Sequence, residues 1–359
     1  MTDAAPPRPP RRWSDAQLVQ LTLVRMREFV REPEALFWVF VFPILMAAGL
    51  GIAFRSKPTS TVTVAVVENP GAQRAEFPKL LAKYKEIIVR EMPEGEASDA
   101  LRNGKVALVA INYGAGVIKY RYDPANEESR LARLTFNDAF MHAVGRVDPL
   151  TAVDELVTEP GSRYIDFLIP GLLGMNLLGS GVWGLGFALV DMRRRKLLKR
   201  FVATPMSRPQ FLLSFLLSRL GLLVLEVAAL IGFGVLAFHV PLRGSLATLA
   251  CICVLGSLCS SGLGLLISSR ARTMEGASGL MNAAMLPMWI LGGVFFASSK
   301  FPGFMQPFVQ ALPLTAVNNA LRANMLEGAP LPAVLPEVVI IAAWTAICFS
   351  LALKLFRWK

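Results

Sequence analysis

Residues 193–213 read RRRKLLKRFVATPMSRPQFLL and separate two long apolar stretches of the chain. A single Arg or Lys at the centre of the hydrocarbon layer costs roughly 2.5–3.5 kcal/mol, and this segment begins with a dense run of such cations. The run must therefore lie in water or at the lipid headgroups. The apolar stretches on its two sides then read as membrane spans.

The composition agrees with an integral membrane protein. Of 359 residues, 54% are hydrophobic and 18% are charged, whereas a soluble domain carries about 25% charged residues. The formal net charge is +11, but the cations gather where apolar stretches end, which is typical of membrane orientation rather than nucleic-acid binding. The four cysteines lie in apolar segments and the two histidines are far apart, so neither a metal site nor a disulfide is expected.

Six stretches approach or exceed the length of about 20 apolar residues that a membrane helix needs. We therefore predict an α-helical polytopic membrane protein with six transmembrane helices. The first of them contains Pro43, which a membrane helix tolerates when a neighbour bonds the carbonyl that the proline leaves free. The predicted spans cover residues 36–54, 165–190, 211–238, 246–269, 276–297 and 334–356.

Basic residues decide the predicted orientation. Arg and Lys gather before the first span, between the second and third, after the fourth and at the end of the sequence. Cytoplasmic loops are enriched in these residues, so both termini are expected on the cytoplasmic side of a bacterial inner membrane. Residues 1–35 then form a cytoplasmic tail and an amphipathic helix, which lies in the membrane interface or belongs to a small soluble cap. The apolar stripe of that helix is Val19, Leu23, Met26 and Val30.

Residues 55–164, between the first and second spans, have a different character. Alternating and helical apolar patterns predict a small α/β domain followed by a helical stalk over 127–157. Because the segment follows the first span, it is expected on the extracytoplasmic side. The predicted strands cover residues 61–67, 87–90, 106–111 and 117–122, and the predicted helices cover 72–85 and 96–102.

Residues 191–210, which we call the elbow, contain the cationic run. An apolar strip that includes Leu197 and Phe201 runs beside the cations, so the second span is expected to continue as an amphipathic helix. Thr204-Pro205 interrupts this helix, because the residue before a proline is pushed out of the helical region. Residues 207–210 (SRPQ) are a capping box that starts the next helix. The alternative is a basic loop that serves only to orient the protein in the membrane.

Small residues predict close helix contacts in the fourth span. Gly256, Ser260, Gly264 and Ser268 recur every fourth residue. This spacing lets helix backbones approach closely. The contact is either with another helix of the same chain or with a second copy.

Three motifs in order carry a family resemblance. Residues 193–207 run from the charged helix into Thr-Pro-Met-Ser, residues 292–296 read GGVFF, and residues 312–322 read LPLTAVNNALR. Together with REP at residues 31–33 and Pro43, they resemble the membrane subunit of ABC exporters of the type-2 permease family, also called type V. One departure is Lys196, where members of that family often carry glycine.

The resemblance implies a mode of action. The elbow would be the coupling helix that touches a separate ATPase, and residues 298–322 would form a re-entrant segment on the outer face, with an ordinary outside loop as the alternative. The chain would pair with a second copy or with a related permease. The residues implied in ATPase contact are Arg193, Arg194, Arg195, Lys196, Lys199, Arg200, Thr204, Pro205 and Ser207.

Polar and aromatic residues in the spans are candidates for the translocation path. An ionisable residue inside a membrane span is a functional candidate by default, and Glu226 lies two turns from Arg219 on one helix face. In the structural alternative, Arg219 extends to the interface and Glu226 bonds to another polar group. The candidate path residues are Asn176, Glu226, Asn282, Phe295 and Phe296.

Catalytic motifs are absent from the sequence. It contains no G-x-x-x-x-G-K-[ST], H-E-x-x-H or G-x-S-x-G. We therefore expect a non-catalytic permease subunit of an ATP-driven exporter that moves an amphiphilic or polymeric substrate outward, with ATP and Mg in the partner ATPase and no cofactor or metal in this chain. The expected partners are the ATPase, a second permease and membrane lipid, but not nucleic acid. Two other functions stay open: a ligand-binding receptor without transport, and a membrane-embedded enzyme that uses Glu226 or Asp166.

Overall fold

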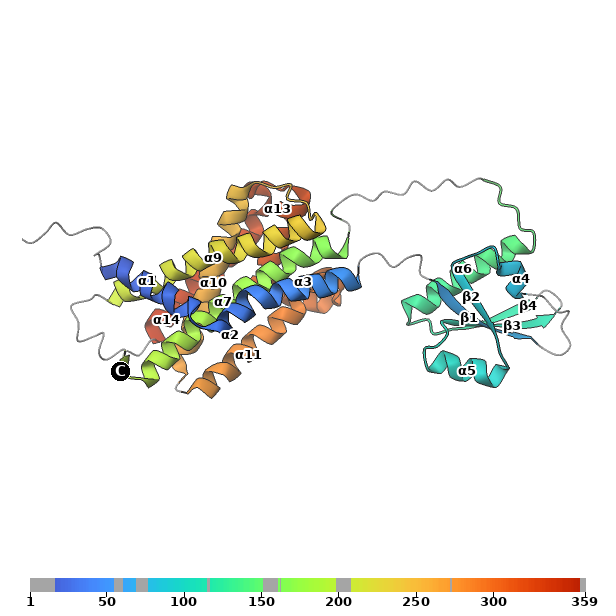
Figure 1. Cartoon of the computed structure of the whole chain (residues 1–359), viewed down its shortest axis with the longest axis horizontal. Coiled ribbons are helices and arrows are strands. Elements are labelled where there is room, and N and C mark those ends of the chain that lie inside the picture. Colours follow the sequence, from blue (N-terminus) through green and yellow to red (C-terminus); the bar gives the residue numbers. More distant parts are fainter. Residues whose placement is uncertain are drawn as a thin grey trace, which may run out of the picture. The chain divides into compact units, whose positions relative to one another are not determined.

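The computed structural model of the chain describes residues 17–54, 61–68, 77–114, 117–150, 161, 163–197, 208–271 and 273–355. The chain forms two compact units (Figure 1). A helical unit contains Met1–Arg55 and Thr158–Lys359, and an α/β unit contains Ser56–Val157. The α/β unit occupies the segment where the sequence predicts a separate domain.

The helical unit consists of long apolar helices joined by short segments. Because α2, the π-helical turn η2 and α3 follow one another directly, they form a single apolar stretch at the N-terminal side. The elements of this unit are α1 (Gln17–Val30), α2 (Pro33–Leu36), η2 (Phe37–Val41), α3 (Phe42–Ala53), α7 (Tyr164–Arg194), α9 (Arg208–Phe238), α10 (Leu246–Arg270), α11 (Met274–Leu291), the 3₁₀ turns η3 (Ser298–Lys300) and η4 (Gly303–Met305), α12 (Gln306–Ala311), α13 (Pro313–Glu327), η5 (Leu331–Val334) and α14 (Leu335–Leu355).

Within the described residues, five helical stretches are long and apolar enough to cross a membrane. Each overlaps one of the six predicted spans, so a polytopic membrane protein is confirmed. The five stretches are Pro33–Ala53, Tyr164–Arg194, Leu213–Phe238, Leu246–Arg270 and Leu331–Leu355.

The remaining predicted span, residues 276–297, corresponds to α11. This helix has 18 residues, about 27 Å at 1.5 Å per residue, and it includes Glu275, Asn282 and Pro287. It ends at Leu291 because Gly292 and Gly293 follow, and Gly293 takes a φ of 72°, a left-handed conformation that favours glycine. A sixth crossing at α11 therefore stays a prediction, and its extension to residue 297 is wrong.

Helices α7 and α10 form the centre of the helical unit. In the most apolar 18-residue stretch of each helix, 67% of the residues are buried in α7 and 61% in α10, but only 17% in α14. Their contact is close because small residues face each other: a Cβ at Gly181 would meet Ser260, and a Cβ at Gly264 would lie 2.8 Å from the carbonyl oxygen of Val182. The small residues predicted to pack closely in α10 therefore contact helices of the same chain.

The α/β unit is a four-stranded sheet with helices on both faces (Figure 1). The strand order is β2-β1-β3-β4, in which β1, β2 and β3 run parallel and β4 runs antiparallel to β3. Alternate residues of β1 enter different cores: Val64 and Val66 pack with Phe77 and Phe136 of α4 and α6, whereas Ala65 lies on the face covered by α5. The elements are β1 (Val62–Glu68), α4 (Phe77–Leu81), β2 (Ile87–Glu91), α5 (Glu94–Arg102), β3 (Leu108–Gly114), β4 (Val117–Arg121) and α6 (Glu127–Ala143).

The four strands overlap the predicted ranges, whereas the stalk differs. The helix predicted over 127–157 ends at Ala143, where Gly145 takes a φ of 105° and the amide of Arg146 bonds the carbonyl of Met141. This is a glycine-dependent helix end, so α6 covers only the first part of the predicted helical stalk, and residues 151–157 lie outside the described residues. Of the helix predicted over 72–85, α4 covers the middle, and residues 72–76 lie outside the described residues.

Candidate functional site

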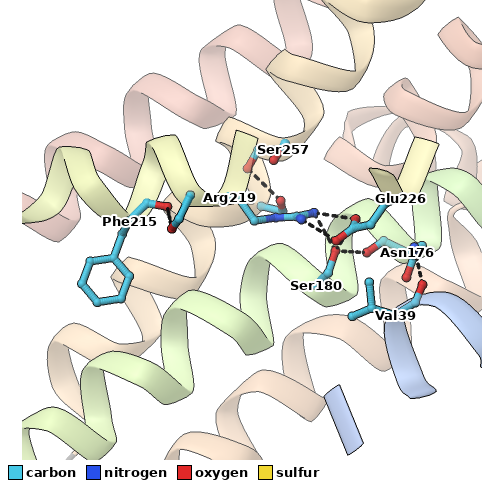
Figure 2. Close-up of polar contacts among 9 residues, drawn as sticks. Val39, Asn176, Ser180, Phe215, Arg219, Glu226 and Ser257 are labelled. Carbon is cyan, nitrogen blue, oxygen red and sulfur yellow. Dashed lines mark hydrogen bonds and ion pairs between the residues drawn. The ribbon is translucent and has the colours of Figure 1, made fainter. Parts of the chain in front are cut away.

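A buried polar cluster of Asn176, Ser180, Arg219 and Glu226 joins α7 to α9 (Figure 2). The Arg219 guanidinium donates to the two carboxylate oxygens of Glu226 over 2.6 and 3.0 Å. It also donates to the Ser180 hydroxyl over 2.6 Å, and that hydroxyl lies 2.5 Å from the carbonyl oxygen of Asn176. Arg219 and Glu226 share a helix face because they are seven residues apart, which is two turns.

The cluster continues into the first span through Asn176. Its side-chain amide donates to the carbonyl oxygen of Val39 over 3.0 Å. In a regular α-helix the amide of residue 43 would bond this carbonyl, but residue 43 is proline and has no N–H. Asn176 on α7 thus supplies a donor to the carbonyl four residues before Pro43. The sequence shows the need for such a donor but not its identity.

Both charges of this cluster are buried, so each depends on the other as its partner. The Arg219 side chain is 8% exposed and that of Glu226 is 0% exposed. Removing one member of a buried ion pair costs about 3–5 kcal/mol, because the other charge stays without a partner. The expected alternative, in which Arg219 extends to the interface, is wrong because its guanidinium turns back into the bundle toward Glu226.

The second and third sequence motifs meet at a second polar contact, which we call the 292–322 junction. Asn318 of α13 donates to the carbonyl of Gly292 over 2.7 Å, and Arg322 donates to the carbonyl of Gly293. The Arg322 guanidinium also stacks on the Phe167 ring of α7, 3.6 Å from its centre, and bonds the Phe167 carbonyl. The motif contains Asn318 and Arg322, but sequence reasoning assigned neither of them a role.

In the cationic run of residues 193–200, the structure describes the first four cations and separates Arg193 from the next three. Arg193 is half-buried and donates to the carbonyls of Ser268 and Ala271, both over 2.9 Å, at the C-terminal end of α10. A cation at this position stabilises the helix end. The next three cations of the run, Arg194, Arg195 and Lys196, are exposed.

Helix α7 ends at Arg194 and a left-handed turn follows at Lys196, whose φ is 58°, so the prediction that the second span continues without a break to Thr204 is wrong. This conformation favours glycine, so the structure shows the glycine-type bend although lysine occupies the position. The predicted contact residues Lys199, Arg200, Thr204, Pro205 and Ser207 lie outside the described residues. The next helix, α9, begins at Arg208 with Pro209 in its first turn, as the capping box predicts.

Helix α1 packs beside the elbow. The Arg25 guanidinium lies 4.3 Å above the centre of the Phe215 ring of α9 and donates to the sulfur of Met192 of α7 over 3.0 Å. On the next turn, a Cβ at Gly221 would lie 3.3 Å from the Met26 methyl group. The predicted N-terminal helix therefore contacts both helices that flank the elbow.

The predicted path residues do not come together. Asn176 and Glu226 are buried at 7% and 1% exposure, whereas Asn282 on α11 is exposed. Phe296 is 64% exposed, and Phe295 is half-buried. Two of the five predicted path residues thus belong to the interior of one chain and three lie nearer its surface.

The structure gives the enzyme alternative little support. The carboxylate of Asp166 is fully buried and bonds the Arg163 side chain and the Gly161 amide, which is a helix-capping arrangement. The carboxylate of Glu226 forms an ion pair with Arg219. Among the described residues, no group of three or more His, Cys, Asp or Glu is placed to hold a metal ion.

Sequence comparisons agree with the arrangement of motifs. A family profile described as ABC-2 family transporter protein matches residues 33–354. The chain is 26% identical over 51% of its length to ABC transporter G family member 20 of Dictyostelium discoideum, of which it covers 25%. It is 28% identical over 53% of its length to the probable multidrug ABC transporter permease YbhS of Escherichia coli (strain K12), of which it covers 51%. It is 25% identical over 77% of its length to the linearmycin resistance permease protein LnrN of Bacillus subtilis (strain 168), of which it covers 71%. The chain thus spans a quarter and about half of the length of the first two relatives.

Proposed function

The chain belongs to the ABC-2 family of transporter proteins, and from this membership we propose that it is the transmembrane permease subunit of an ATP-driven exporter. The observation that carries the proposal is the family match over residues 33–354, combined with the cationic end of α7. Helix α7 has 31 residues, about 46 Å at 1.5 Å per residue, whereas the hydrocarbon layer is about 30 Å thick. The end of α7 therefore reaches into water with Arg194, Arg195 and Lys196 exposed.

The partner at this end is a separate ATPase. We propose that ATP and Mg bind to this partner, because the given sequence itself carries no phosphate-binding loop. The exposed cations of the elbow offer complementary charge to an acidic surface, and the helix-break-helix pattern supplies a rigid corner on which the ATPase can act. We place the elbow and both termini in the cytoplasm of a bacterial inner membrane, and the α/β unit on the extracytoplasmic side.

A second permease, either another copy or a related chain, completes the transport path. Helix α11 presents Leu280, Leu286 and Ile290 at 50%, 50% and 64% exposure, and Asn282 is exposed among them. A polar amide facing lipid is costly, which favours a protein-covered face for α11. We propose that Asn282, Phe295 and Phe296 line a path between the two permeases.

The substrate that we propose is an amphiphile. The names of two relatives refer to multidrug transport and to linearmycin resistance. An apolar path with isolated polar groups suits a molecule with both characters. A polymeric substrate is the second candidate, so vesicle transport should be measured with an amphiphile and with a polymer.

Co-purification and vesicle transport with the ATPase test this function. In Thr204→Gly with Pro205→Gly the corner becomes flexible while the cations remain, so membrane level and ATPase association should persist while export and substrate-stimulated ATP hydrolysis fall together. In Lys199→Gln with Arg200→Gln the ATPase association itself should weaken, and the difference from the wild-type chain should be smaller at high salt, which screens exposed charges. Full export by the glycine pair would leave the elbow as an orientation signal only. Ligand binding without any ATPase association would favour a receptor.

Cysteine labelling tests the proposed orientation. Single cysteines at Ala125 and Ser299, in a background without the four native cysteines, should react with an impermeant maleimide in intact cells. A cysteine at Ser207 should react only after lysis. Labelling of the Ser207 position in intact cells would overturn the orientation.

A further inference from the structure

We propose that Asn176, Ser180, Arg219 and Glu226 are positioning residues that make α7 and α9 one rigid body and join that body to the first span. The inference rests on the proposed function, because it concerns how motion at the elbow reaches the membrane. It replaces the expectation that Asn176 and Glu226 touch the substrate.

The position of the cluster relative to the elbow carries the first step. Ser180 lies 14 residues before Arg194, about 21 Å along the helix at 1.5 Å per residue, and Arg219 lies 11 residues after Arg208, about 16 Å on the same basis. Arg25 of α1 bridges the two helices near the elbow, because it contacts Met192 of α7 and Phe215 of α9. The cluster connects them again deep in the bundle, so a change in the angle between α7 and α9 must break one of these two contacts.

The contact that the cluster makes between α7 and α9 is strong, because it consists of buried hydrogen bonds to charged groups. Separating α7 from α9 removes Ser180 from both Arg219 and Glu226, which it contacts over 2.6 and 3.1 Å. These charged groups have no water to replace the lost contacts, because Glu226 is fully buried and Arg219 nearly so. Breaking a buried hydrogen bond to a charged group is costly. Motion imposed at the elbow therefore moves both helices together.

The contact between Asn176 and Val39 extends the rigid body to a third span. Val39 lies in η2, a π-helical turn that precedes Pro43, and single π-helical turns inside helices are frequent at functional sites. Asn176 holds this turn on α7 through the carbonyl of Val39. Displacement of α7 is thus transmitted to the first span at its irregular turn.

The same burial argues against substrate contact. A path between two permeases must be reached from the chain surface, whereas the side chains of Ser180, Arg219 and Glu226 are directed toward one another between α7 and α9, and that of Asn176 is directed toward Val39 of η2 (Figure 2). The polar atoms of Glu226 are occupied by Arg219 and Ser180. The four residues therefore position helices and do not contact the substrate.

Two variants separate positioning from stability. Arg219→Met with Glu226→Leu replaces the buried ion pair by apolar side chains, a change that proteins often tolerate without loss of stability. Asn176→Ala leaves the ion pair in place and removes only the link to the first span. Arg121→Met with Glu94→Leu is the matched control, because this pair in the α/β unit is more exposed, at 37% and 50%.

The transported substrate per ATP hydrolysed is the deciding measurement, made in vesicles with the ATPase partner. It should fall by about tenfold in the Met/Leu variant, fall less in Asn176→Ala, and stay unchanged in the control. Membrane level and ATPase association should stay normal in all three. A normal ratio in both test variants overturns the inference and leaves the proposed function intact, whereas failure of the wild-type chain to bind an ATPase or to transport overturns the function itself.

A distance measurement tests the rigid body directly, and it also decides the case if the Met/Leu variant is not inserted into the membrane. Spin labels at Gly184 of α7, where a side chain would meet nothing within 4 Å, and at Leu217 of α9, which is 38% exposed, report the separation of the two helices. The distance should be the same with and without a trapped ATP analogue in the wild-type chain. A shift on ATP trapping in the wild-type chain would show that α7 and α9 move separately.

Discussion

Asn318 of α13 donates its side-chain amide to the carbonyl of Gly292 over 2.7 Å and so ties the end of α11 to a helix 26 residues further along the chain. The contact needs the glycine of a third helix, because a Cβ at Gly174 of α7 would overlap the Asn318 side-chain oxygen. Gly293 then turns the chain with a φ of 72°. The two C-terminal motifs of the sequence are thus parts of one structural junction.

Asn318→Ala should destabilise the helical unit. It leaves the buried carbonyl of Gly292 without this donor, which costs about 1–3 kcal/mol. Asn319→Ala is the control, because its amide makes an exposed contact of 3.3 Å with Gln310. Thermal unfolding of the purified protein in lipid nanodiscs measures both. Equal unfolding temperatures for the two variants would show that the Gly292 contact contributes nothing.

Gly181→Ala should loosen the contact between α7 and α10. Its Cβ would overlap the Ser260 side chain, whereas a Cβ at Gly184 on the same helix meets nothing within 4 Å. Overpacking costs about 1–3 kcal/mol, and Gly184→Ala should instead be neutral or stabilise the helix by up to about 1 kcal/mol.

Ser260→Gly in the Gly181→Ala background tests the cause of that destabilisation. It removes the overlapping side chain and should recover part of the lost stability, as measured by thermal unfolding in nanodiscs. If Gly181→Ala behaves like Gly184→Ala, the close approach of α7 and α10 is not as the structure has it.

The sequence allows prediction of features that the bilayer requires, such as long apolar spans, and of strands, in which side chains alternate between the two faces of a sheet. A span must be long and apolar, so α7, α9, α10 and α14 were recognisable from hydropathy. Residues that alternate between two cores, such as Val64 and Ala65, predict a strand. The cationic elbow was recognisable because its charges cannot enter the hydrocarbon.

Contacts between helices could not be predicted in the same way. The two-turn spacing of Arg219 and Glu226 places them on one face, but only packing brings Ser180 to them and Asn176 to Val39. The end of α11 was missed because the residues after it are also apolar, so hydropathy carries no stop signal there. Arg193 looked like the other elbow cations, and its contact with the end of α10 depends on the crossing of two helices.

Stability of the α/β unit should decline at high pH, in part through Tyr120. Burial raises the pKa of this phenol above its ordinary value, and its hydroxyl donates to Asn137 over 3.1 Å. The folded unit therefore keeps a proton that the unfolded chain releases above pH ~10, so this contribution to stability is complete below that pH and is lost as the pH rises through the folded pKa.

Tyr120→Phe checks the origin of this decline. The variant should be less stable at neutral pH by about 0.5–1.5 kcal/mol, because it lacks the hydrogen bond. It should also lose less stability between neutral and high pH than the wild-type chain. Protease resistance of the α/β unit in the full chain measures this, with Tyr113→Phe as control because Tyr113 is 46% exposed. An unchanged pH profile for Tyr120→Phe would assign the decline to other groups.

Lys196→Gly and Lys196→Ala separate the two properties of the elbow lysine, its charge and its backbone conformation. Both variants remove the exposed cation, but only glycine adopts a φ of 58° without strain. For other residues this conformation costs about 1–2 kcal/mol. Lys196→Gly should therefore be more stable than Lys196→Ala by about 1 kcal/mol, whereas ATPase association should weaken equally in both and by less at high salt. Thermal unfolding in nanodiscs measures the first quantity, and co-purification over a salt series measures the second. If the two variants unfold at the same temperature, α7 does not end in a left-handed turn. If neither variant weakens ATPase association, this lysine contributes only to the bend and the contact must be made by other residues of the elbow.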